Sequence, residues 1–255
     1  ALLLIPLWMF FSKDIKGGFS GFLVKVNLKG AKLPLRPVFT RGLGSAITIG
    51  AGGSAGQEGP IAAIGGAIGS QFGQLFKVSG DRLKVLVACG AAAGVAATFN
   101  APIAGVFFAT EIVLLSSFEL ASFTSIVIAS GMATVVSRAL LGNHSELIAP
   151  PYFVGSFWEI GLYLLLGLLI GCLAAGFIDV HFRIKDRIDA IKLPRFAKLL
   201  LGGLAVGTIG MVFPQVFGNG YDFMSRVLSG HFAWYLLAGL VVVKMVATSI
   251  TLGSG

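Results

Sequence analysis

Charge is scarce in this sequence. Only 12% of the 255 residues are charged, whereas 56% are hydrophobic, 36 are glycine and the mean hydropathy is +0.90. A water-soluble domain of this length does not have such a composition. Lysine and arginine are absent from residues 85–137, which is long enough for about two membrane crossings of roughly 20 residues each. We therefore predict an integral membrane protein that crosses the membrane several times.

Residues that hold metals or perform covalent catalysis are also few. The two cysteines, Cys89 and Cys172, lie in apolar stretches without a partner at metal-ligand spacing, and we interpret them as small core residues. None of the three histidines has a second ligand three or four positions away, which favours interfacial histidines over metal ligands. An intramembrane enzyme would need paired catalytic groups in apolar helices, and the sequence has none. We expect no enzyme, no catalytic residue and no metal site.

The positive charge is grouped in short segments between apolar stretches. The net charge is +8, and the basic residues cluster at 13–41, 77–84 and 183–198. These clusters are not interleaved with aromatic residues, so they predict membrane topology and not a nucleic-acid partner. Because positively charged loops stay inside, we place all three clusters on the cytoplasmic side and the segment 142–155, which has no basic residue, outside.

Glycine and proline divide the apolar sequence into short pieces, which predicts an all-α polytopic fold with short broken helices. Pro102 has no backbone N–H and so fits the first turn of a helix that follows a break. The chain begins within an apolar run and ends within a motif, so we expect it to be a fragment of a longer protein. The predicted elements are an apolar helix end at 1–11, a basic segment with one short helix at 12–41, two pieces in 42–76 that break at 52–60, two pieces in 85–115 that break at 99–102, and crossings at 120–141, 157–182, 199–216 and 231–252.

One internal repeat is visible. Residues 41–52 and 244–255 align without a gap and pair Arg41 with Lys244, Ile-Thr with Ile-Thr, and glycine with glycine at the end. Repeated halves with interrupted helices are typical of transporters whose site lies at the repeat interface. We expect a single transmembrane domain over 1–255, with most of the first repeat in 1–142 and the start of the second in 157–255. A chance match between two glycine-rich helices is the alternative.

Glu58 is the only Asp, Glu, Lys or Arg between Arg41 and Lys77, and it lies in the glycine-rich string from Gly52 to Pro60. An isolated carboxylate at membrane depth indicates an ion or proton site. The N-terminus of a helix favours an anion, so this carboxylate would occupy the position of a permeating anion until protonation releases it. The alternatives are a helix-capping glutamate without a transport role and a ligand for a cation.

Three groups of residues resemble motifs of the CLC family of chloride channels and proton-coupled chloride transporters. They are Gly53-Ser-Ala-Gly-Gln-Glu-Gly-Pro60; Gly90-Ala-Ala-Ala-Gly94 with Phe99-Asn-Ala-Pro-Ile-Ala-Gly105 and Glu111; and Gly218-Asn-Gly-Tyr-Asp222. The resemblance implies a CLC-type inverted-repeat fold, a homodimer, and a separate anion pathway in each subunit. It also implies bound chloride and no cofactor.

The same resemblance assigns roles to individual residues. Glu58 matches the external gating glutamate of the family, and the rest of the anion-binding turn is matched by Gly56, Gln57, Gly59 and Pro60. Family members usually have a basic or small residue where this chain has Gln57. We expect that difference to change the local potential more than the fold.

Three further positions match less closely. Ser20 is the nearest match to the central serine of the family, but its turn lacks the proline, so it is either an anion ligand or a simple turn serine. Proton-coupled members carry a glutamate one residue after the acid that matches Glu111, where this chain has Ile112. An apolar side chain cannot relay a proton. Glu111 would either hold water at the internal mouth or be an interfacial acid. The phenylalanine motif and the pore tyrosine of the family would lie beyond Gly255.

These expectations describe a chloride transport protein of a prokaryotic cell membrane that is gated by protonation of Glu58 and is channel-like or weakly coupled to protons. A fully coupled chloride/proton antiporter is the first alternative. A cation carrier that uses Glu58 as its ligand is the second. The expected partners are chloride, protons, membrane lipid and a second copy of the chain.

Overall fold

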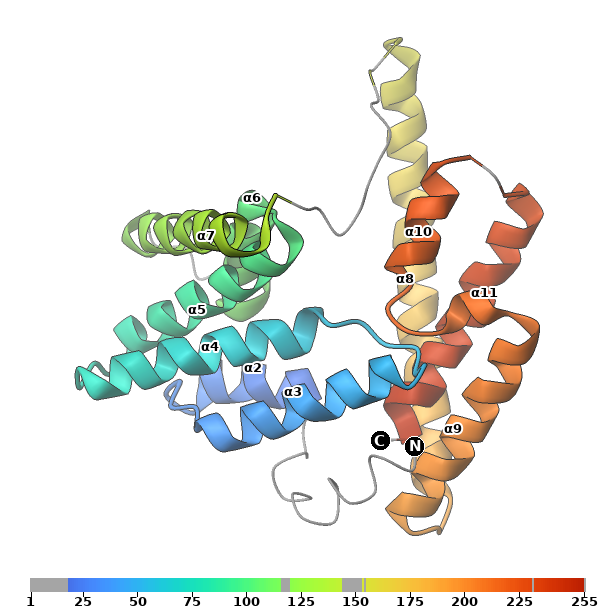
Figure 1. Ribbon diagram of the computed structural model, residues 1–255, viewed down its shortest axis with the longest axis horizontal. Coiled ribbons are helices and arrows are strands. Elements are labelled where there is room, and N and C mark those ends of the chain that lie inside the picture. Colours follow the sequence, from blue (N-terminus) through green and yellow to red (C-terminus); the bar gives the residue numbers. More distant parts are fainter. Residues whose placement is uncertain (1–17, 116–119, 144–152, 154, 231, 255) are drawn as a thin grey trace. The chain divides into compact units, whose positions relative to one another are not determined.

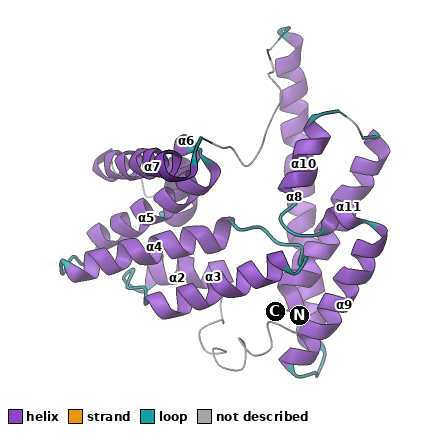
Figure 2. Ribbon diagram, in the orientation of Figure 1, coloured by secondary structure: helices purple, strands orange, loops and turns teal. Residues whose placement is uncertain are grey.

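The computed structural model describes all residues except 1–17, 116–119, 144–152, 154, 231 and 255. The described residues form helices and loops without a strand (Figure 2), which confirms the predicted all-α class. They divide into two compact units. We call the described residues of 18–47 and 56–143 the N-terminal unit, and the described residues of 48–55 and 153–254 the C-terminal unit. The predicted helix end at 1–11 and most of the predicted external segment lie outside the described residues.

The N-terminal unit is built around small and apolar side chains. Its buried cluster includes Phe22 and Val26 of α2, together with a run of alanines on α4 and α5. A buried serine on α4, Ser70, accepts the backbone N–H of Leu33 at 2.9 Å and donates to the carbonyl of Ala31 at 2.7 Å, which satisfies the turn that follows α2. The elements of this unit are α2 (Gly18–Leu28), α3 (Leu35–Gly50, as far as Ile47), α4 (Glu58–Leu75), α5 (Asp81–Phe99), α6 (Pro102–Phe107), the π-helix η1 (Phe108–Val113) and α7 (Leu120–Leu141).

Helices α4 and α5 cross through glycines and lie side by side in Figure 1. A Cβ added at Gly65 would overlap the carbonyl oxygen of Gly90, and a Cβ added at Gly90 would overlap the carbonyl oxygen of Gly65. The glycines four positions further along the two helices, Gly69 and Gly94, also face backbone of the other helix. Small residues four positions apart on both helices allow such a close approach, which is a common way to join helices in membranes.

The break between α5 and α6 lies where the sequence predicts it. Asn100 has a left-handed conformation with φ +54°, which asparagine tolerates better than most residues, and Pro102 begins α6. Side chains at the end of α7 fix this turn: Arg138 Nε donates to Asn100 Oδ1 at 2.6 Å. The hydroxyl of Ser130 donates to the carbonyl of Pro102 at 2.6 Å. The two-piece prediction for 85–115 is thus confirmed.

The C-terminal unit contains the longest helix of the described chain. Its helices are α8 (Trp158–Ala190), α9 (Arg195–Val212), the short 3-10 helix η2 (Pro214–Val216), α10 (Tyr221–Leu228) and α11 (Trp234–Ser254). The predicted crossing at 157–182 coincides with α8 from Trp158 onward, and the helix continues for about two more turns through its charged end. Asp179 and Arg183, one turn apart, form an ion pair there at 2.6 Å. The sequence reasoning missed α10.

The described helices confirm a protein that can cross a membrane several times. By length and composition, five helices of the described chain can span a bilayer. These are α5, α7 from Ser122 onward, α8, α9 and α11. A shorter apolar helical segment covers Pro102–Val113.

Candidate functional site

Glu58 is the first residue of α4 and follows a non-helical stretch, residues 51–57, that begins where α3 ends. Its side chain is half-buried and turns back over Gly56, so that a Cβ added at Gly56 would overlap Glu58 Oε2. Glycine is therefore required at position 56 for this arrangement. Gln57 is the N-cap residue but makes no capping hydrogen bond with its side chain. Pro60 lies in the first turn of α4, where a backbone N–H would have no intrahelical partner. The absence of an N–H in proline therefore costs no helical hydrogen bond there.

The beginning of α2 lies against the beginning of α4. A Cβ added at Gly59, the second residue of α4, would lie 3.4 Å from Cβ of Phe19, the second residue of α2. The Phe19 ring also packs against the ring of Phe108, with a centroid distance of 6.1 Å. Two helix N-termini with unpaired N–H groups therefore meet here, and both carry the positive end of a helix dipole. Ser20 is the next residue of α2 and is exposed.

Glu111 and Ile112 lie on a different element, the π-helix η1, and both side chains are exposed within the described chain. The amide of Asn27 in α2 donates to the carbonyl of Val113 at the end of this π-helix, at 3.0 Å. Single π-helical turns are often found at functional sites. The structure thus brings the turn at residues 56–60 and the start of α2 together and leaves Glu111 and Ile112 on a separate helix.

Two basic residues that the internal repeat pairs have corresponding contacts in the two units. In the N-terminal unit, Arg41 Nη1 donates to the carbonyl of Gly18 at 3.2 Å, at the start of α2. In the C-terminal unit, Lys244 Nζ donates to the carbonyls of Val216 and Gly218, both at 2.9 Å, in the loop before α10. Gly18 and Gly218 both have positive φ. Arg41 therefore bonds to the first residue of α2, and Lys244 holds the loop before α10. Sequence reasoning missed these contacts although the repeat had paired the two residues.

Replacing Lys244 by methionine should lower the free energy of unfolding of the full-length protein by about 1–3 kcal/mol, because two carbonyls inside the unit lose their donor. Lys244→Arg retains a donor and should be milder. The matched control is Lys192→Met, because Lys192 is exposed. Unfolding in mixed detergent micelles measures the effect, and equal stability of Lys244→Met and the wild type would contradict this account of the loop.

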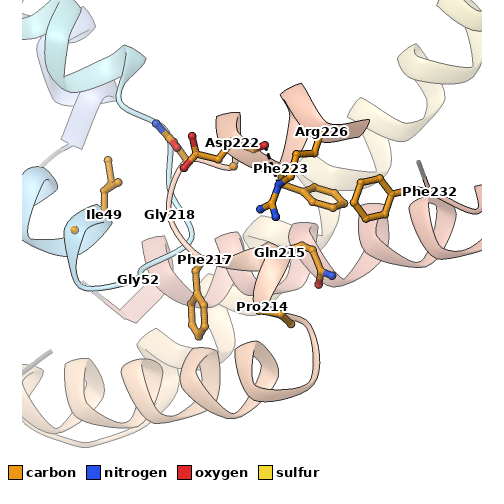
Figure 3. A pocket seen from close by; sticks show the side chains of 13 residues that line it. Ile49, Gly52, Pro214, Gln215, Phe217, Gly218, Asp222, Phe223, Arg226 and Phe232 are labelled. Atoms are coloured by element: carbon orange, nitrogen blue, oxygen red, sulfur yellow. Dashed lines mark hydrogen bonds between the residues drawn. The ribbon is translucent and has the colours of Figure 1, made fainter. Parts of the chain in front are cut away.

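A cavity of about 580 Å³ lies in the C-terminal unit beside this loop (Figure 3). Its lining combines the polar residues Gln215, Asp222 and Arg226 with the rings of Phe223 and Phe232, which pack edge to face with centroids 5.0 Å apart. The side-chain oxygen of Gln215 is buried and has no hydrogen-bond partner among the described residues. None of the predicted site residues lines this cavity.

The comparisons with known proteins identify the family. The family described as "Voltage gated chloride channel" matches residues 1–255. The chain therefore belongs to the CLC family of membrane proteins, as the motifs around Glu58 and Asn100 predict.

Curated relatives come from bacteria and plants. The chain is 32% identical over 244 residues to the H(+)/Cl(-) exchange transporter ClcA of Vibrio parahaemolyticus. This alignment covers 90% of the chain and 52% of ClcA. The chain is also 37% identical over 225 residues to the chloride channel protein CLC-f of Arabidopsis thaliana. This alignment covers 83% of the chain and 29% of CLC-f. The chain spans about half the length of the bacterial relatives that it matches.

Two solved structures confirm the CLC-type fold. One is described as a slow cyanobacterial Cl-/H+ antiporter; it is 28% identical with a TM-score of 0.78, and the match covers 100% of this chain and 61% of that one. The other is described as a CLC-type fluoride/proton antiporter; it is 24% identical with a TM-score of 0.81, and the match covers 99% of this chain and 64% of that one. At 24% identity, the second likeness shows the fold alone.

Proposed function

We propose that the full-length protein transports chloride across a membrane and that Glu58 gates the pathway. One observation carries this proposal: Glu58 stands where the N-termini of α2 and α4 meet, with Phe19 and Gly59 in contact. Exposed N–H groups and positive dipole ends favour an anion at such a place. Family membership and the names of the relatives, which include chloride channels and chloride exchangers, support chloride as that anion.

The ligands that we propose for chloride are the turn residues Gly56, Gln57, Gly59 and Pro60, together with Ser20. The backbone N–H groups of Gly56, Gln57 and Gly59 would take part through their position at the start of α4, whereas Pro60 has no N–H and would contribute by shaping the turn. Ser20 belongs to the first turn of α2, so its own N–H group is among those without an intrahelical partner. No cofactor is needed for transport of this kind, and we propose a transport protein and not an enzyme.

The proposed pathway is channel-like or weakly coupled to protons. Ile112 stands where proton-coupled members of the family carry a glutamate, and its side chain cannot accept a proton. The second candidate is a fully coupled chloride/proton antiporter. It is favoured by the likeness to the cyanobacterial antiporter and by the exchange transporters among the relatives.

Measuring the reversal potential of the full-length protein in planar bilayers tests this choice. With a fixed chloride gradient, a proton gradient should leave the reversal potential of a channel at the chloride equilibrium potential. A shift of the reversal potential with the proton gradient would contradict the channel-like proposal and support the antiporter. Absence of any chloride current or flux would contradict chloride transport itself.

We also propose that the protein works as a homodimer in a prokaryotic cell membrane and interacts with chloride, protons and lipid. The family resemblance and the apolar helices support this. Chemical crosslinking of the full-length protein in its native membrane should give a dimer band, and a band of monomer size alone would contradict it.

A further inference from the structure

Ser54 is a buried polar residue in the non-helical stretch after α3. Its exposed fraction is 0%. Its backbone N–H donates to Thr251 Oγ1 at 3.2 Å. Its hydroxyl and the hydroxyl of Thr248 share one hydrogen bond at 3.0 Å, in which either can be the donor. Both threonines lie on α11, nearly two hundred residues further along the chain. All three residues belong to the C-terminal unit.

Each of the three hydroxyl groups has at least one hydrogen-bond partner. The hydroxyl of Thr251 donates to the carbonyl of Ala247 at 2.9 Å, so its oxygen is left to accept the N–H of Ser54. Because Ser54 is fully buried, losing either partner would leave a polar group in an apolar surrounding, which is costly. The two hydrogen bonds therefore fix both the backbone and the side chain of Ser54 against α11.

A glycine next to Ser54 allows this close contact. A Cβ added at Gly53 would lie 2.6 Å from Cγ2 of Thr48 and 3.3 Å from Cγ2 of Thr251. Thr48 and Thr251 are the two threonines that the internal repeat aligns. The equivalent positions of the two repeats thus face each other across a residue without a side chain.

The anchor precedes Glu58 by only four residues. Ala55, Gly56 and Gln57 between them are non-helical, and four residues of chain reach at most about 14 Å. Gly56 would otherwise give this connection considerable freedom. An anchor at Ser54 on α11, a helix of the second repeat, therefore fixes one end of the short connection that leads to Glu58.

We propose that Ser54 is a positioning residue of the anion gate, held by Thr248 and Thr251 so that a helix of the second repeat restrains the turn that carries Glu58. The proposal rests on the proposed function of Glu58 as the gate. Ser54 itself does not contact the anion in this arrangement. It acts through the placement of Glu58.

Matched variants separate the anchor from general packing. Thr251→Val keeps the shape and removes the acceptor for the Ser54 N–H, whereas Thr251→Ser keeps the acceptor. The control is Thr208→Val, because Thr208 makes the same bond within its own helix, to the carbonyl of Leu204 at 2.9 Å, and is exposed. Ser54→Ala removes the hydroxyl contact with Thr248.

Hydrogen exchange of the full-length protein tests the anchor without any transport measurement. In Thr251→Val, amide exchange in the peptide that covers residues 51–57 should be about tenfold faster than in the wild type. Thr251→Ser and Thr208→Val should keep the slow exchange. Unchanged exchange in Thr251→Val and Ser54→Ala would overturn the anchor.

A double-mutant cycle in chloride efflux tests whether the anchor acts through Glu58. In liposomes at neutral pH, Thr251→Val should raise efflux about threefold where Glu58 is present, because a freer carboxylate occupies the path less, and should have no effect in the Glu58→Gln background. An equal effect in both backgrounds would overturn the proposal, because it would show a merely structural role. If the wild type shows no chloride efflux while exchange in Thr251→Val rises, the proposed function fails and the anchor stands.

Discussion

Chloride efflux through Glu58→Gln in the full-length protein should persist and lose its dependence on pH. Glutamine has the size of a protonated glutamate and cannot become an anion, so it does not compete with chloride at the start of α4. Wild-type efflux should rise as the pH falls, because protonation removes the competing charge. Between pH 7.5 and 4.5 the wild-type efflux should therefore rise, whereas the efflux of Glu58→Gln should vary by less than about twofold.

Efflux from liposomes over this pH range measures the effect. The matched control is Asp186→Asn, an exposed carboxylate on α8, which should keep the wild-type pH profile. If Glu58→Gln abolishes flux altogether, the carboxylate is needed as a ligand and the cation-carrier alternative is favoured. If the pH profile of Glu58→Gln equals that of the wild type, Glu58 is a helix-capping residue and the gate must lie elsewhere.

The second large effect concerns the crossing of α4 and α5. Gly90→Leu should prevent the normal packing of these helices, because even a Cβ at this position overlaps the carbonyl oxygen of Gly65. Neither backbone can move without disturbing the neighbouring contacts of Gly69 and Gly94. Overpacking at a contact between two backbones should lower the free energy of unfolding by about 3 kcal/mol or more. Gly90→Ala should cost less but still destabilise, although alanine favours helices more than glycine does.

The yield of monodisperse full-length protein in mild detergent and its unfolding midpoint measure this effect. The control is Gly167→Leu on α8, where an added Cβ meets nothing within 4 Å in the described chain. Gly167→Leu should behave like the wild type. Wild-type stability of Gly90→Leu would show that α4 and α5 do not pack through these glycines.

Much of the fold could be predicted from the sequence, because the signals involved are local. Pro102 and Asn100 mark a helix break through the conformations that proline and asparagine prefer, and the structure places the break there. The end of α8 could not be read in this way. Charged residues near residue 183 indicate where a helix leaves the membrane but not where it stops, and α8 continues to Ala190.

The sequence by itself determined the class of protein, the broken helices and the family, and it made Glu58 the candidate gate, because hydropathy, turn chemistry and motif spacing are properties of short segments. Only the tertiary structure decided which residues meet. The contact of Phe19 with Gly59, the bonds of Lys244 to the loop before α10, and the anchoring of Ser54 by Thr248 and Thr251 all join residues far apart in the chain. A hydroxyl or an ammonium group can bond to any carbonyl or hydroxyl that the fold brings near, and its own sequence neighbourhood does not say which one that is.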